Sequence, residues 1–92
     1  MINSNINVNS LIQQGTQIKH TNSNYSPYDV LDYTKWVCSI LTYLKDKKLD
    51  SSIQYTRINA LIDAINDNGV SENTYKTVMG ALQSCKDMYP EI

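Results

Sequence analysis

Chemistry-bearing residues are scarce in this sequence. Its 92 residues include no phenylalanine, one histidine, two cysteines, two prolines and three glycines. Two cysteines are too few for a disulfide scaffold. A metal site needs clustered His, Cys, Asp or Glu ligands, whereas His20, Cys38 and Cys85 are far apart in the sequence. We therefore expect no bound metal, and we expect both cysteines to be small buried apolar residues, with a single disulfide bridge as the alternative.

Catalytic and cofactor-binding patterns are also missing. The glycines occur singly, so no glycine-rich loop is present to hold a phosphate. Any Ser–His–Asp arrangement would have to recruit His20 from the polar N-terminal segment. Asp63 and Asp67 lie one helical turn apart, but off the expected apolar stripe, where carboxylates are solvated. We expect a protein that is not an enzyme, with no cofactor and no small-molecule substrate.

Neither charge nor hydropathy indicates a nucleic acid or membrane partner. Eight basic residues face nine acidic ones, whereas nucleic-acid binders usually have a basic excess. No apolar stretch approaches the roughly 18 residues of a membrane span. The Asn-rich N-terminus lacks the basic start and apolar run of a signal peptide. These features favour a cytoplasmic location without a membrane partner.

Residues 1–24 are rich in Asn, Ser, Gln and Thr. Such a composition buries too little apolar surface to offset the entropy cost of ordering the chain. We therefore expect a disordered polar tail. The alternative is an arm that becomes ordered on a partner, with Ile6, Val8, Leu11 and Ile12 as its anchors.

The remainder of the chain, residues 25–92, has the pattern of three helices, at about 27–48, 52–68 and 72–88. Ser26 before Pro27 predicts an N-cap for the first helix, and Ser71 predicts one for the third. Gly69 is suited to the left-handed conformation in which helices often end. Apolar residues recur at helical spacing in all three segments. The sequence therefore predicts an all-α fold, a small three-helix domain behind the tail.

The first of these helices is unusually aromatic. The chain has seven tyrosines and one tryptophan, and four of these eight aromatic residues lie between positions 28 and 43. Tyrosine and tryptophan are enriched at protein interfaces. One row is offset from the apolar stripe through Val37, Leu41 and Leu44, and it consists of Tyr33, Trp36, Ile40 and Tyr43. Either two helices cover both rows, or this row stays open to bind a partner.

We take the open row as the leading hypothesis. It predicts a non-enzymatic protein–protein interaction module of adaptor, immunity or regulatory type. Its partner would be another protein or a second copy of the chain, because domains this small often gain stability by associating. The expected binding residues are the four members of the row, Tyr33, Trp36, Ile40 and Tyr43.

An alternative comes from residues 68–78, which look like the core of a helix-turn-helix DNA-binding motif. The match covers about 20 residues, with the turn at Gly69-Val70-Ser71 and Thr74 three residues after the serine. The sequence departs from that family at Ile65, where a small residue usually lets the two helices approach. The resemblance implies a DNA-binding regulator whose contacting residues are Ser71, Glu72, Asn73, Lys76 and Thr77.

Overall fold

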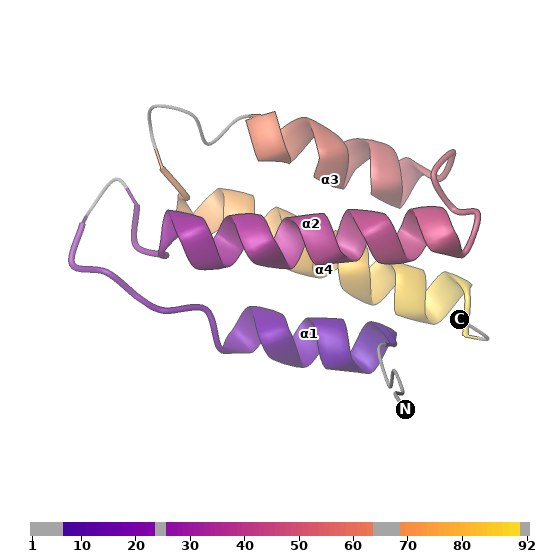
Figure 1. Ribbon diagram of the computed structural model, residues 1–92, viewed down its shortest axis with the longest axis horizontal. Coiled ribbons are helices and arrows are strands. Elements are labelled where there is room, and N and C mark those ends of the chain that lie inside the picture. Colours follow the sequence, from indigo (N-terminus) through magenta and orange to yellow (C-terminus); the bar gives the residue numbers. More distant parts are fainter. Residues whose placement is uncertain (1–6, 24–25, 64–68, 91–92) are drawn as a thin grey trace.

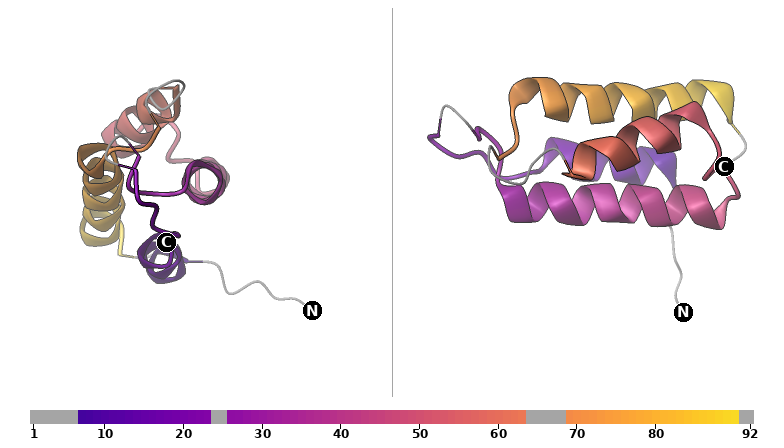
Figure 2. Two further views of the ribbon diagram at one scale, coloured as in Figure 1. Left: turned by 90° about the vertical axis from the view of Figure 1, so that its left-hand side faces the viewer. Right: turned by 90° about the horizontal axis from the view of Figure 1, so that it is seen from above.

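The computed structural model describes residues 7–23, 26–63 and 69–90, and in them four helices and no strand. These are α1 (Val8–Thr16), α2 (Val30–Asp46), α3 (Ile53–Asp63) and α4 (Glu72–Met88). Consecutive helices run in opposite directions (Figure 1). Viewed along the bundle, each helix occupies one corner (Figure 2). The predicted all-α class is confirmed, whereas the predicted number of three helices is wrong.

The extra helix, α1, lies in the segment expected to be a disordered tail. Asn7 and Ser10 form a capping box, in which each side chain bonds the other residue's backbone N–H at 2.9 Å. A helix of nine residues is not stable alone. It is stabilised here because Val8, Leu11 and Ile18 are buried in the common core. The expected tail is therefore wrong for residues 7–23, while residues 1–6 and 24–25 lie outside the described parts.

Helix α2 begins later than expected because Asp29, and not Ser26, is its N-cap. The Asp29 carboxylate accepts a hydrogen bond from the Asp32 N–H at 3.0 Å. The Ser26 hydroxyl instead donates to the Tyr28 carbonyl and accepts from the Val70 N–H at 2.8 Å. Tyr28 is also paired with His20 and Val70 through isolated β-bridges. Ser26 thus joins two extended segments at one end of the bundle.

Helix α4 covers the same residues as the third expected helix. The Ser71 hydroxyl accepts from the Thr74 N–H at 3.1 Å, which confirms the predicted N-cap. Gly69 has φ = 70°, the left-handed conformation expected of it. The second expected helix corresponds to α3 as far as Asp63, and residues 64–68 lie outside the described parts.

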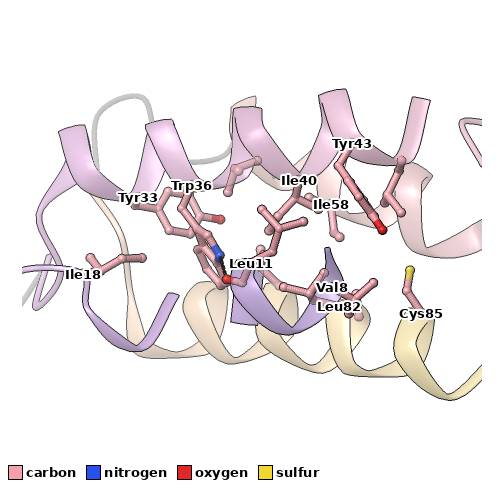
Figure 3. Packing of buried hydrophobic residues seen from close by; sticks show 14 of the residues in the cluster. Val8, Leu11, Ile18, Tyr33, Trp36, Ile40, Tyr43, Ile58, Leu82 and Cys85 are labelled. Carbon is pink, nitrogen blue, oxygen red and sulfur yellow. Dashed lines mark hydrogen bonds between the residues drawn. The ribbon is translucent and has the colours of Figure 1, made fainter. Parts of the chain in front are cut away.

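One core fills the space between the four helices (Figure 3). α2 contacts each of the other three helices, whereas α1 and α3 do not contact each other in their described residues. Contacts with three neighbours, which α4 also has, explain the wide apolar arc on α2, because three neighbours need more surface than one. The core residues are Val8, Leu11, Ile18, Tyr28, Tyr33, Trp36, Val37, Ile40, Tyr43, Leu44, Ile58, Val70, Val78, Ala81, Leu82 and Cys85.

Gly80 lies in the middle of α4 with no packing reason to be glycine in the described chain. Apart from its own helix backbone, no atom lies within 4 Å of where a Cβ would stand. Glycine inside a helix costs about 0.5–1 kcal/mol relative to alanine. We expect Gly80→Ala to raise the free energy of unfolding by that amount, measured by urea titration. A loss of stability would show that the position is sterically closed.

Candidate interaction surfaces

The aromatic row predicted to bind a partner is buried. Tyr33, Trp36 and Ile40 are 0% exposed and Tyr43 is 8% exposed. The expectation of an open surface is therefore wrong for the folded chain, because three of these side chains are fully buried and Tyr43 is nearly so. The alternative, in which other helices cover both rows of α2, is the arrangement observed.

The helix that covers this row is α1. The Trp36 indole N–H donates to the Leu11 carbonyl at 2.7 Å, and the two residues lie side by side in Figure 3. From α4, the Tyr75 hydroxyl donates to the Gly15 carbonyl at 3.0 Å. A Cβ on Gly15 would stand 2.6 Å from Trp36 Cε2, so only glycine fits beneath the indole. The aromatic row is thus a docking surface, and its occupant is the N-terminal segment of the same chain.

The rings continue as a ladder from the surface to the core. His20 lies 4.9 Å from Tyr28, which is stacked on Tyr75 at 4.2 Å between ring centroids. Tyr75 lies 5.5 Å from Trp36, which meets Tyr33 edge to face at 6.0 Å. Such pairs contribute roughly 0.5–1.5 kcal/mol each beyond burial. The ladder therefore links His20 and Tyr28, which lie between α1 and α2, to α4 through Tyr75 and to α2 through Trp36.

Burial and charge keep these tyrosines protonated. Burial, with a smaller contribution from the Glu72 carboxylate, raises the pKa of the Tyr28 hydroxyl. Burial, and then the neighbouring Tyr28, raises the pKa of Tyr75. Burial alone raises the pKa of Tyr33. The pKa of each hydroxyl is thus higher in the folded chain than in the unfolded chain. The free energy of unfolding therefore keeps its full value below pH 10 and falls as the pH rises above the ordinary tyrosine value.

The Tyr33 hydroxyl is buried and has no hydrogen-bond partner among the described residues. An unpaired buried hydroxyl costs about 1–3 kcal/mol in desolvation. We expect Tyr33→Phe to raise the free energy of unfolding by about 1 kcal/mol, which would raise the melting temperature by roughly 4–8 °C in a domain of this size. Calorimetry measures this shift directly. A lower melting temperature would mean that the hydroxyl has a partner and contributes to stability.

The residues of the DNA-binding alternative lie at the start of α4. Ser71, Glu72, Asn73 and Lys76 are exposed and Thr77 is half-buried. Ser71 is used as the N-cap, and the Lys76 ammonium is 3.9 Å from the Glu72 carboxylate. α3 and α4 lie side by side in opposite directions (Figures 1 and 2), whereas helix-turn-helix pairs cross steeply. This face therefore lacks both the crossed geometry and a surplus of positive charge.

An open groove runs along the outer side of α3 and has a volume of about 460 Å³. We call it the α3–α4 groove, and its lining residues are Ser51, Ile53, Thr56, Arg57, Ala60, Leu61 and Thr77. Ile53 is 76% exposed, the largest exposed fraction among the exposed large apolar side chains. Among the described residues of the lining, Arg57 is the only charged one. Because Ile58 on the opposite side of α3 is fully buried, this short helix has apolar residues on two faces.

A second groove, of about 690 Å³, separates α1 from α2 and is lined mainly by polar side chains, among them Gln14, Thr42 and Cys38. Both cysteines are free thiols, and Cys38 is exposed while Cys85 is buried. The expectation of a buried residue is thus correct for Cys85 and wrong for Cys38, which is exposed at the groove between α1 and α2. Burial raises the pKa of the Cys85 thiol, which keeps it protonated.

The described residues, 7–23, 26–63 and 69–90, contain no group of three or more His, Cys, Asp or Glu side chains that could hold a metal ion. In the same residues, every helix is too short or too polar to cross a membrane. No protein-family model matches the chain, and comparisons with curated proteins and with solved structures also give no match. Function must therefore be inferred from the geometry and chemistry of the chain.

Proposed function

We propose that this protein is a non-enzymatic protein-interaction module that binds its partner through the α3–α4 groove. The observation that carries the proposal is Ile53, a large apolar side chain left 76% exposed at the edge of an open groove. Apolar side chains that are exposed in a concave surface give a partner a contact area that a convex surface lacks. The cytoplasmic location inferred from the sequence remains a prediction.

Burial of this surface supplies a driving force for binding. An isoleucine contributes about 1.5–3 kcal/mol when it passes from water into an apolar environment. Ala60 and Leu61 continue the apolar strip along α3, and Thr77 of α4 forms the opposite wall. A groove between two helices is a recurrent seat for an amphipathic helix. A helical segment of a partner protein therefore fits this groove better than a flat protein surface does.

The DNA-binding alternative has no specific observation in its favour. It makes a separate prediction, because phosphate contacts release counterions and the affinity must fall steeply with salt. If the protein retards no DNA in gel electrophoresis at low salt, the DNA-binding alternative is excluded.

A matched pair of variants tests the proposed surface. Ile53→Asp places a charge in the groove. Leu31→Asp places the same charge on another exposed apolar residue, which lies on α2 outside the groove and is 62% exposed. Both changes lie on the surface, so helix content by circular dichroism should be unchanged. We expect a cross-linked partner from native cells to be captured by the wild type and Leu31→Asp, and lost with Ile53→Asp. Equal capture by all three proteins would contradict the proposal.

A further inference from the structure

The lining of the α3–α4 groove also indicates what kind of segment it accepts. Arg57 is the only arginine of the chain, in which the other seven basic residues are lysines. It is exposed, and in the described residues it takes part in no ion pair. The planar guanidinium binds a carboxylate through two parallel hydrogen bonds, and arginine is enriched over lysine at interfaces. The described part of the groove thus has one strong donor and no carboxylate to pair with it.

The residues around Arg57 set the spacing of the partner's side chains. Ile53 lies one turn before it on α3, while Ala60 and Leu61 lie one turn after it. From Ile53 to Leu61 the helix rises by about 12 Å, which corresponds to roughly two turns of a second helix laid along it. The small Ala60 side chain leaves room for a large apolar side chain opposite.

We infer that the occupant is an amphipathic helix of a partner protein that presents a carboxylate to Arg57, with apolar side chains one turn before and one turn after it. This inference rests on the proposed function of the groove. A second copy of the chain fits less well, because a symmetric contact between two α3–α4 grooves brings together two surfaces whose only charge among the described lining residues is the same arginine. Like charges that meet across an interface are destabilising.

Selection from a phage-displayed library of helical 16-residue peptides tests the inference on the full chain. Wild-type protein should enrich peptides that carry Asp or Glu with apolar residues three or four positions away on both sides. Arg57→Glu should instead enrich Lys or Arg at the same position. For a synthetic peptide of the first class, fluorescence anisotropy should show binding at least tenfold weaker to Arg57→Ala, and an intermediate loss for Arg57→Lys.

The outcomes separate this inference from the proposed function. Peptides that need Ile53 but show no acidic preference, or that bind Arg57→Ala as well as wild type, would overturn the inference and leave the groove as an interaction site. Concentration-dependent association of the chain that is abolished by Ile53→Asp would also overturn it, because the occupant would be a second copy. If the library yields no peptide whose binding depends on Ile53, that result contradicts both the inference and the proposed function.

Discussion

Replacing Trp36 with alanine is expected to destabilise the fold strongly rather than weaken an interface. Trp36 is 0% exposed, and its indole N–H donates to the Leu11 carbonyl at 2.7 Å. Removing a buried tryptophan costs about 3–5 kcal/mol. The total stability of a chain this small is roughly 5–14 kcal/mol. The variant should therefore lose about a fifth or more of its stability, and where the total is near the lower end of that range it should be largely unfolded at room temperature.

Urea titration followed by circular dichroism measures the effect, with Leu31→Ala as a control. Leu31 is a large apolar residue of the same helix but is 62% exposed, so its truncation should change the free energy of unfolding by less than about 0.5 kcal/mol. If Trp36→Ala kept native helix content and stability and affected only association, Trp36 would lie at an interface and not in the core.

The second large effect is expected from Gly15→Ala in α1. A methyl group there would stand 2.6 Å from Trp36 Cε2 and 2.8 Å from Met79 Cε, closer than packed carbon atoms approach. Helix propensity alone would make the alanine variant more stable by about 1 kcal/mol. Overpacking typically costs about 1–3 kcal/mol, so we expect a net loss, and separation of α1 from the indole where the core cannot adjust.

Trp36 is the only tryptophan, so its fluorescence reports on this contact. Gly15→Ala should shift the emission to longer wavelength and lower the urea midpoint. Gly80→Ala is the matched control, because the same change in α4 meets open space. The two substitutions should have opposite signs. If both were stabilising, the position beneath the indole would be open and α1 would not be seated as described.

Much of the fold could be predicted because local signals and tertiary packing agree in the C-terminal part. The Ser71 cap and the left-handed Gly69 are determined by neighbouring residues, and α4 covers the residues expected of it. The prediction for the N-terminal part was wrong for a physical reason. α1 has only a few apolar residues, and these order the segment only because Trp36 and Tyr75 of distant helices bind its carbonyl groups. Composition cannot reveal such a contact.

For the aromatic row, the sequence predicted the surface but not the segment that covers it. The sequence identified an apolar surface on α2 wider than one packing contact requires, and that surface exists. The apolar pattern could not predict that α1 covers this surface, because the composition of residues 1–24 predicts a disordered tail. Cap assignment at α2 failed similarly, since Ser26 and Asp29 are both good caps, and the hydroxyl of Ser26 is used by Val70. The α3–α4 groove carries no clear sequence signal, because a single apolar residue such as Ile53, off the buried face of α3, does not predict a groove.

Amide hydrogen exchange across α1 tests most directly whether α1 covers the aromatic row. The Leu11 N–H donates to the Asn7 carbonyl at 3.1 Å, and the following amides are within the helix. With α1 docked, amides from Leu11 to Thr16 should exchange far more slowly than in an unstructured chain, and Trp36→Ala should remove that protection. Exchange of these amides at unstructured rates, while α2 and α4 remain protected, would contradict the account and leave the aromatic row open.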